Sequence, residues 1–388
     1  MPSDDYDVLI VGCGISGAVV ARHFAEKGKK VQIYERRDHV GGNMYDYLDI
    51  NGIRVHKYGP HVFHTNDENI KKYVERFGSW TEFNVRCRAE MLGMITPSPF
   101  NFQTIDDFYS ADEAKTLKYK LLTYYGKEEA TIVEMLDSDD ADIKAYADFL
   151  YQNDYSLYTA KQWGISPEDI DKSVLKRVPV YFSYKDGCFA DAYQMVPIEG
   201  YTEWFRKLLD HRNISISLGQ DVFKRLTIAE NKTLINGHEF IGLVVYTGPI
   251  DELFDCRYGS LPYRSLAFKW GYADKKYHQQ APLVVNPSAK EYTRITEYSY
   301  FPHKHLSNQK TSFSYECPVQ YKRNSGMEPY YPIQTRESAE LLHQYEQRAF
   351  QIPNLVCVGR LARFKYYNMD QALIAALETC AELDDKGW

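Results

Sequence analysis

Short, mostly apolar runs lie near both ends of the chain. They span residues 8–11, 31–34, 243–248 and 355–359. Runs of this length predict buried parallel strands. The apolar spacing of other segments predicts helices over residues 15–27, 201–209, 338–350 and 369–383. We therefore expect an α/β fold that opens with one βαβ unit and uses both ends of the chain.

The middle of the chain has a different pattern. Residues 65–80 have amphipathic helical spacing, and residues 104–160 are helical with many charges. Residues 126–130, inside that stretch, are a candidate mobile loop. From about residue 178 to 330, segments rich in β-branched and aromatic residues predict a largely antiparallel sheet. A helical insertion and a sheet-rich region are therefore expected between the two ends.

Composition narrows the classes of function. Lys plus Arg is 46 and Asp plus Glu is 53, a net charge of −7, and a net-acidic chain is a poor general binder of nucleic acid. The 7 cysteines include no CxxC, which favours reduced thiols in a cytoplasmic protein and indicates no metal site. We expect neither a signal peptide nor a membrane span. The 33 tyrosines suit sugar- or nucleotide-sized pockets.

A glycine motif, GxGxxG, follows the first predicted strand and precedes the first helix. The first glycine permits a tight turn, the second lets the backbone approach a pyrophosphate, and the third lets helix and strand pack closely. The N–H groups at the start of the helix can then bind phosphates. The motif predicts a dinucleotide site that includes Gly12, Gly14, Ile15, Ser16 and Gly17.

Two further features favour FAD over NAD. Glu35 ends the second strand, where it can accept hydrogen bonds from an adenosine ribose, and a Gly-Gly-Asn sequence follows shortly after it. Near the other end, a Gly-Arg pair stands between the last strand and the last helix. The residues assigned to FAD on these grounds are Glu35, Arg36, Gly42, Asn43, Gly359 and Arg360.

These patterns predict an α/β protein with a discontinuous Rossmann-type FAD-binding domain, a helical insertion domain and a mainly antiparallel β-sheet domain. We assign residues 1–80, 200–245 and 340–388 to the first, residues 100–165 to the second, and residues 81–99, 175–199 and 255–335 to the third.

Several motifs, taken in order, resemble those of the UDP-galactopyranose mutase family along essentially the whole chain. They are Tyr58-Gly59-Pro60-His61-Val62-Phe63-His64-Thr65, Tyr158-Thr159-Ala160-Lys161-Gln162-Trp163-Gly164, Arg177-Val178-Pro179-Val180, Tyr263-Arg264-Ser265-Leu266, Thr293-Arg294-Ile295, Pro329-Tyr330-Tyr331-Pro332, Gly359-Arg360-Leu361 and Tyr366. The resemblance implies an isomerase that interconverts the pyranose and furanose forms of a nucleotide-linked galactose-type sugar, for cell-surface polysaccharide synthesis. It also implies that FAD must be reduced, and that its N5 attacks the anomeric carbon as the nucleoside diphosphate leaves.

The resemblance assigns roles to single residues. Arg177 and Arg294 hold the departing diphosphate, where guanidinium gives bidentate contacts that lysine cannot reproduce. Arg264 is a third arginine of this kind. Tyr158 and Trp163 are assigned to the uridine and sugar pocket, and Tyr331, with Tyr330 as its alternative, and Tyr366 to the diphosphate. His61 and His64 are assigned to the flavin, with His64 controlling its geometry. Met369 is assigned to the cofactor, and Asn368 to cofactor and substrate.

Some positions depart from the family pattern. Asn368 stands where the family usually has Asp, Cys188 where a pocket Tyr is usual, and Cys317 replaces the Tyr of "EYP". Losing hydrogen-bond partners changes what a pocket discriminates. A deoxy sugar, an N-acetyl sugar, a heptose or another nucleotide therefore stays open as the substrate. The resemblance further implies a reductant such as NAD(P)H and a homodimer.

Two other classes share the N-terminal pattern. One is a redox flavoenzyme of the amine-oxidase or desaturase type, which would be reduced stoichiometrically by its substrate. The other is a noncatalytic binding module on the same fold, as in GDP-dissociation-inhibitor proteins, which would carry no flavin. The diphosphate arginines and the intact glycine motif argue against the second class.

Overall fold

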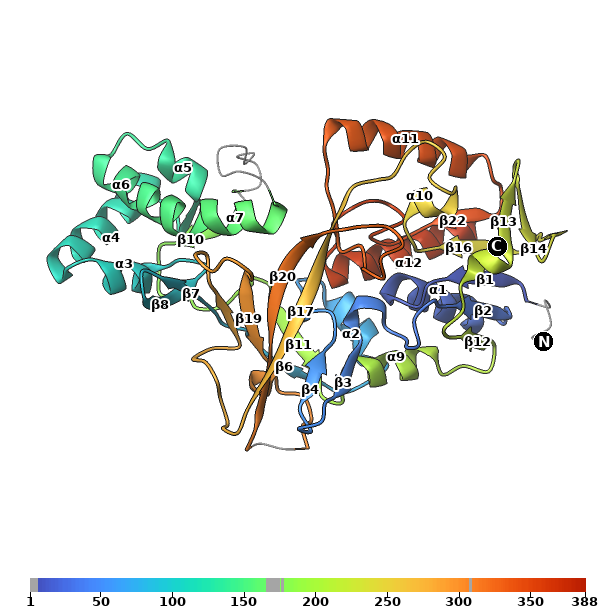
Figure 1. Ribbon diagram of the computed structural model, residues 1–388, viewed down its shortest axis with the longest axis horizontal. Helices are drawn as coiled ribbons and strands as arrows, with labels where there is room; N and C mark the ends of the chain where they lie inside the picture. Colours follow the sequence, from blue (N-terminus) through green and yellow to red (C-terminus); the bar gives the residue numbers. More distant parts are fainter. Residues whose placement is uncertain (1–5, 165–174, 176–177, 307–308) are drawn as a thin grey trace.

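The computed structural model describes residues 6–164, 175, 178–306 and 309–388, without the side chain of Trp163. Three regions follow one another along the long axis of the molecule (Figure 1). A helical region lies at one end, an antiparallel sheet in the middle, and an α/β region at the other end. The N- and C-termini both lie in the α/β region, so that region is built from both ends of the chain.

A five-stranded parallel sheet forms the centre of the α/β region. Its order is β12 (Ile214–Ser217), β2 (Val31–Tyr34), β1 (Val8–Val11), β16 (Leu243–Tyr246) and β22 (Leu355–Cys357). The four apolar runs of the sequence form four of these strands, as predicted. Strand β12 was not predicted, because its residues alternate between apolar Ile and polar Ser and are only partly buried at the sheet edge.

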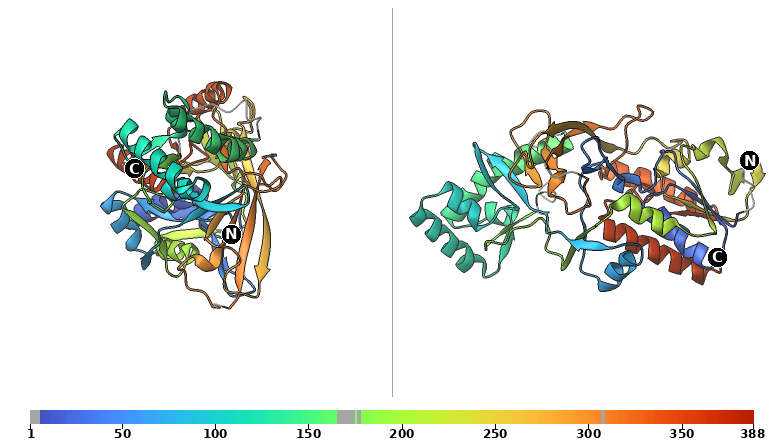
Figure 2. Two further views of the ribbon diagram at one scale, coloured as in Figure 1. Left: turned by 90° about the vertical axis from the view of Figure 1, so that its left-hand side faces the viewer. Right: turned by 90° about the horizontal axis from the view of Figure 1, so that it is seen from below.

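Helices cover this sheet. Seen from below, helices α1 (Ile15–Glu26), α9 (Tyr201–Leu209) and α12 (Met369–Asp385) lie side by side (Figure 2). Their apolar faces share one core with β1 and β2. The remaining helices of this region are α2 (Glu68–Glu75), α10 (Ile250–Leu253) and α11 (Arg336–Phe350). The predicted helix over residues 65–80 is shorter than expected, because Trp80–Glu82 forms strand β6.

A seven-stranded sheet lies in the middle of the molecule. Its order is β21 (Tyr331–Pro332), β17 (Tyr263–Ala273), β20 (Thr311–Gln320), β19 (Arg294–Glu297), β18 (Leu283–Val285), β7 (Cys87–Met91) and β8 (Met94–Ser98). Every pair is antiparallel except β7 with β18. The largely antiparallel sheet of the prediction is therefore confirmed. Smaller sheets join β3 (Asp46–Leu48) with β4 (Arg54–His56), β5 (Phe63–Thr65) and β6 with β11 (Tyr193–Pro197), and β13 (Leu226–Ala229) with β14 (Lys232–Ile235) and β15 (His238–Glu239).

The helical region contains α3 (Phe102–Phe108), α4 (Ala111–Tyr125), α5 (Ile132–Leu136), α6 (Ala141–Leu150), a π-helical turn η2 (Tyr151–Tyr155) and α7 (Ser156–Trp163). The mobility expected at residues 126–130 stays a prediction, but the structure shows that the loop is short. Gly126 ends α4 with a φ of +59°, and the chain then enters strand β9 (Glu129–Thr131), which pairs with β10 (Pro179–Tyr181). Ala130 and Val180 face each other there and are both buried, so packing holds the end of this segment.

The predicted domain boundaries stay a prediction, although the parallel sheet does draw its strands from three separate stretches of chain, residues 8–34, 214–246 and 355–357. None of the helices in the described ranges combines the length and apolar character that crossing a bilayer requires.

Candidate active site

A cavity of about 1250 Å³ opens at the carboxyl ends of β1, β2 and β16. This edge of a parallel sheet is where nucleotide-binding folds hold their ligands. Of the residues that the sequence assigned to FAD, all but His64 line the cavity, from the glycine motif to Met369. Both ends of the chain therefore contribute to one site.

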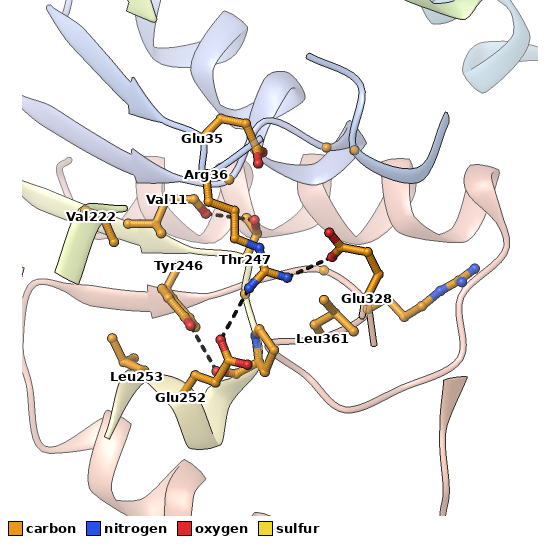
Figure 3. Close-up of a pocket in the computed structure, with 18 of the residues that line it drawn as sticks. Val11, Glu35, Arg36, Val222, Tyr246, Thr247, Glu252, Leu253, Glu328 and Leu361 are labelled. Atoms are coloured by element: carbon orange, nitrogen blue, oxygen red, sulfur yellow. Dashed lines mark hydrogen bonds and ion pairs between the residues drawn. The ribbon is translucent and has the colours of Figure 1, made fainter. Parts of the chain in front are cut away.

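Two glycines bring backbone segments into close contact at the cavity. A Cβ atom at Gly12, whose φ is +99°, would lie 2.1 Å from Oγ1 of Thr247. A Cβ atom at Gly42 would lie 2.9 Å from Cα of Gly14. The Thr247 hydroxyl in turn donates to the carbonyl of Val11 at 2.8 Å (Figure 3). Side chains at either glycine would push apart the turns that form the cavity wall.

The start of α1 provides hydrogen-bond donors for an anion. Gly14 occupies the N-cap position, offers no side-chain cap, and is followed by no acidic residue in the first turn. The first N–H groups of a helix lack partners within it, and the helix dipole favours negative charge there. This end of the cavity therefore fits a pyrophosphate.

Glu35 is held rigidly on the cavity wall. Its Oε2 accepts from the backbone N–H of Cys13 at 2.7 Å, and its Oε1 accepts from the N–H of Arg37 at 2.9 Å. Each carboxylate oxygen keeps a further lone pair, so ribose hydroxyls can still donate to it. The residues present thus fit a dinucleotide whose adenosine lies beside Glu35.

A charged cluster on the same wall was missed by the sequence reading. Arg36 lies between Glu252, at 3.6 Å, and Glu328, at 2.8 Å (Figure 3), and Arg37 contacts Glu328 at 2.7 Å. Burial alone would raise the pKa of Glu328, but Arg37 and Arg36 hold it below its usual value. No local motif marks these contacts, because they join residues that are 216 to 292 positions apart.

A second group of side chains is centred on Arg294. Arg294 and Glu316 face each other on the paired strands β19 and β20. Nε and Nη2 of Arg294 donate to Oε2 of Glu316 at 3.1 and 2.8 Å. Gly59 packs against this pair, since a Cβ there would lie 3.4 Å from the same Oε2. The histidine segment of the sequence is thereby brought next to Arg294.

Aromatic side chains connect this group to the cavity. The guanidinium of Arg360 lies 5.0 Å from the ring centroid of Tyr366, which stacks on Tyr331 at 5.7 Å. Tyr331 and Tyr158 both interact with the charge of Arg294. We call Arg294, Glu316, Tyr158, Tyr331 and Tyr366 the Arg294 group.

His61 lies where the cavity and the Arg294 group meet. Burial lowers its pKa to about 4, and the positive charges of Arg360 and Arg294 contribute. Its Nδ1 lies 2.8 Å from the carbonyl of Gly59, so this nitrogen must carry the hydrogen that is donated. The neutral ring therefore keeps Nε2 as an acceptor.

His64 and Arg264, two further residues predicted for the site, have different surroundings. His64 lines no part of the cavity: its Nδ1 lies 2.8 Å from Oδ2 of Asp191, and its ring stacks on Phe189 at 3.9 Å. Arg264 pairs in register with Tyr331 and donates from Nε to the carbonyl of Gln162 at 3.1 Å. Arg177 and the side chain of Trp163 fall outside the described residues.

The three departures from the family pattern have different surroundings. Asn368 caps α12 through a reciprocal capping box with Gln371. Cys317 is the neighbour of Glu316 on β20 and so faces the opposite side of the sheet, where Lys269 and Glu291 influence its pKa. Only Cys188 interacts with Arg294, and its thiol is hydrogen-bonded to that of Cys87.

A buried cluster of Asp46, His56 and His303 has the residue types of a metal site, but its polar atoms already have hydrogen-bond partners, which for Asp46 are Arg54 and Thr202. Nδ1 of His303 lies 2.7 Å from the carbonyl of Pro197, and Nδ1 of His56 accepts from the N–H of His61 at 3.0 Å. Nε2 of His56 therefore carries a hydrogen and donates to Nε2 of His303, 2.9 Å away. The cluster fixes the backbone at His61.

The fold and the cavity together define a dinucleotide-binding protein of the Rossmann type. Residues 10–77 match the model of the NAD(P)-binding Rossmann-like domain. Residues 153–366, more than half of the chain, match the model of UDP-galactopyranose mutase. The chain belongs to the UDP-galactopyranose mutase family, whose members are isomerases.

Relatives support this over the whole length. A dTDP-fucopyranose mutase of Escherichia coli is 37% identical over 380 residues, which covers 97% of each chain. A probable UDP-galactopyranose mutase of Klebsiella pneumoniae is 35% identical over 383 residues, 97% of this chain and 94% of the relative. A crystal structure of reduced UDP-galactopyranose mutase shares the fold, with a TM-score of 0.74 at 16% identity and coverage of 98% and 94%.

Proposed function

We propose that this protein interconverts the pyranose and furanose forms of a galactose-type sugar linked to a nucleoside diphosphate, using reduced FAD in the 1250 Å³ cavity. The observation that carries the proposal is that His61 lines the cavity together with Arg360, while its pKa is lowered by the charges of both Arg360 and Arg294. A sugar between the two regions would have its diphosphate beside a fixed cation.

Bound reduced flavin supplies an electron pair for the anomeric carbon. The chain supplies the rest. Arg294, held by Glu316 in a defined orientation, stabilises the negative charge that develops on the diphosphate as the glycosidic bond breaks. Tyr331 and Tyr366 line the path between this arginine and the cavity, and their phenols are hydrogen-bond partners for phosphate oxygens. Arg177 and Arg264 are proposed to add positive charge at the same place.

Neutral His61 is suited to accept a hydrogen bond at Nε2. Its pKa of about 4 keeps the ring uncharged at neutral pH, so it adds no positive charge that would attract the diphosphate away from Arg294. The buried histidine pair behind it keeps its backbone in place. A donor such as NAD(P)H is needed to keep the flavin reduced, and the dimer and cytoplasmic location stay predictions.

Two substrates are proposed, in the order that the relatives favour. The first is a dTDP-linked 6-deoxy sugar, as acted on by the relative from Escherichia coli, and the second is UDP-galactose. Cys188 supports the 6-deoxy sugar. It interacts with Arg294 and stands where the family usually has a tyrosine. A thiol is a weaker hydrogen-bonding group than a phenol.

The test is turnover by the dithionite-reduced holoenzyme. The enzyme would be incubated with dTDP-fucopyranose, UDP-galactopyranose and their furanose isomers, and the products separated by chromatography. We expect isomerisation only after reduction, without further consumption of reductant. Stoichiometric reduction of the flavin by a substrate would instead support the oxidoreductase class, and isolated protein without flavin would support the binding module.

A further inference from the structure

The loop between β20 and β21, residues 321–328, forms one wall of the cavity. Residues 322–327 are exposed to solvent, and Asn324 and Gly326 have positive φ values of +60° and +77°. A segment with few buried contacts opens at a lower free energy than the packed core does, so this loop is suited to open by itself. Its residues that line the cavity are Tyr321, Arg323, Asn324, Gly326, Met327 and Glu328.

Polar contacts fasten the loop at both ends. At its start, the hydroxyl of Tyr321 donates to Oε1 of Glu252 at 3.2 Å. At its end, Oε2 of Glu328 lies 2.8 Å from Nη2 of Arg36 and 2.7 Å from Nη2 of Arg37. Oε1 of Glu328 also accepts from Nε of Arg37 at 3.1 Å. Two successive arginines thus hold one carboxylate.

Arg36 joins three parts of the cavity wall. It follows β2, and its side chain reaches Glu328 on the loop and Glu252 on α10, which is 3.6 Å away (Figure 3). The loop cannot move away from β2 unless these ion pairs break. The side chains of Arg36 and Glu328 are 46% and 21% exposed, and ion pairs with that much solvent contact are weak. These contacts therefore form a latch that can open and close again.

The cavity is large enough for a ligand while the latch is closed. Its volume is about 1250 Å³, above the roughly 300–1,000 Å³ of pockets that hold drug-sized ligands. Arg36 and Glu328 line it together with Glu35, the residue that fits an adenosine ribose. A dinucleotide in the cavity therefore has its adenosine end on the side of the latch.

We propose that residues 321–328 are a lid over the adenosine end of the cavity, that the contacts of Glu328 with Arg36 and Arg37 hold it shut, and that it must open for FAD to enter or leave. The proposal rests on the proposed function only in that FAD occupies the cavity. A latch that closes with or without ligand slows entry and release alike, and so changes both rates more than Kd. A direct contact with FAD acts mainly on release.

The first test follows flavin fluorescence in Glu328→Gln and in the unmodified enzyme. Release is measured from the holoenzyme, and entry with the full chain stripped of flavin. We expect both rates to rise about tenfold in Glu328→Gln, which is ~1.4 kcal/mol, while Kd changes by about threefold or less. Charge alone predicts slower release, because the substitution frees two arginines to attract the anionic cofactor. Glu340→Gln, which removes an exposed ion pair with Arg336 on α11, is the matched control and should leave both rates unchanged.

A second test needs no variant and so does not depend on whether Glu328→Gln folds. Lys322 and Arg323 make the lid a site for trypsin, and cleavage of a folded protein tracks the population in which the segment is open. Because salt weakens ion pairs between exposed charges, we expect cleavage after these residues to be about fivefold faster in about 0.5 M than in about 0.05 M NaCl. A free peptide with the sequence of residues 318–330 corrects for the salt response of trypsin itself.

Equal rates of release in Glu328→Gln and Glu340→Gln would overturn the lid. Faster release with unchanged entry would do the same, since that pattern marks a direct contact, and so would equal cleavage at both salt concentrations. Each of these results leaves mutase turnover intact. An unmodified protein that binds no flavin would instead count against the proposed function itself.

Discussion

The cavity and the Arg294 group are built in opposite ways. In the cavity, the backbone of consecutive residues forms the wall, and Gly12, Gly14 and Gly42 let its segments approach closely. In the Arg294 group, single side chains from separate elements meet because strands β19 and β20 pair in one register. A substitution in the cavity should therefore act through shape, whereas one in the Arg294 group should act through charge.

The largest effect is expected from Arg294→Lys. Lysine keeps the charge but cannot contact both Glu316 and a diphosphate through a planar fork. We expect kcat/KM of the reduced enzyme to fall about 10²–10³-fold, with flavin content unchanged. Arg336→Lys, at an exposed arginine on α11, is the control for the exchange itself. A threefold effect or less in Arg294→Lys would show that charge alone is sufficient there.

Acid should weaken the junction between the two regions. Burial lowers the pKa of His56 far below its usual value, and brings that of His61 to about 4 and that of His303 to about 3. In the unfolded chain each ring has a pKa of about 6.5. Between this pKa and the lower pKa of the folded protein, the unfolded state binds more protons than the folded state. The free energy of unfolding therefore falls as the pH falls.

The expected loss between pH 7 and 5.5 is about 3–4 kcal/mol for the three rings, measured by urea unfolding. His303→Gln should reduce this pH dependence by about a third. A free energy of unfolding that stays constant over this range would mean that the rings are not buried in the neutral form.

Gly12→Ala tests the role of shape in the cavity. The added methyl group would collide with Thr247, and φ is positive as well. We expect flavin to bind about 100-fold more weakly, or ~2.7 kcal/mol, as measured by the ratio of flavin to protein absorbance.

Gly28→Ala separates the effect of the steric collision from the effect of the positive φ. Gly28 also has a positive φ, +86°, but nothing lies within 4 Å of an added Cβ. That variant should lose roughly 1–2 kcal/mol of stability from backbone strain and keep its flavin. Equal loss of flavin in both variants would show that the close contact between Gly12 and Thr247 is not the reason for weaker flavin binding.

The smallest effect concerns Asn368. Its capping box predicts that Asn368→Ala lowers stability by ~1 kcal/mol, measured by urea unfolding. Asn368→Asp should preserve the cap within about 0.5 kcal/mol. A change in stability for Asn368→Asp as large as that for Asn368→Ala would show that the amide does more than cap the helix.

Residue spacing alone predicted the cavity, whereas Arg294, Tyr158, Tyr331 and Tyr366 were predicted only through the resemblance to a family, and Glu316 was missed. The glycine motif works through local backbone geometry, so spacing alone was enough to find Gly12 and its neighbours. The pairing of Arg36 with Glu328 depends on how distant loops meet, and no spacing rule expresses that. His64 was expected beside the flavin, but a two-residue period along β5 says only which residues share a face, and its actual partner, Asp191, lies far away in sequence.

The parallel sheet also determines when, during synthesis, the nucleotide-binding domain can fold and bind its cofactor. Strand β16, which pairs with the central strand β1, and the edge strand β22 are separated from β1 by more than 230 and 340 residues, respectively. At roughly 5–20 residues per second, the ribosome finishes the first βαβ unit tens of seconds before Gly359 emerges. The nascent chain therefore exposes an incomplete nucleotide fold for most of its synthesis, and the cofactor can be captured only at the end of translation.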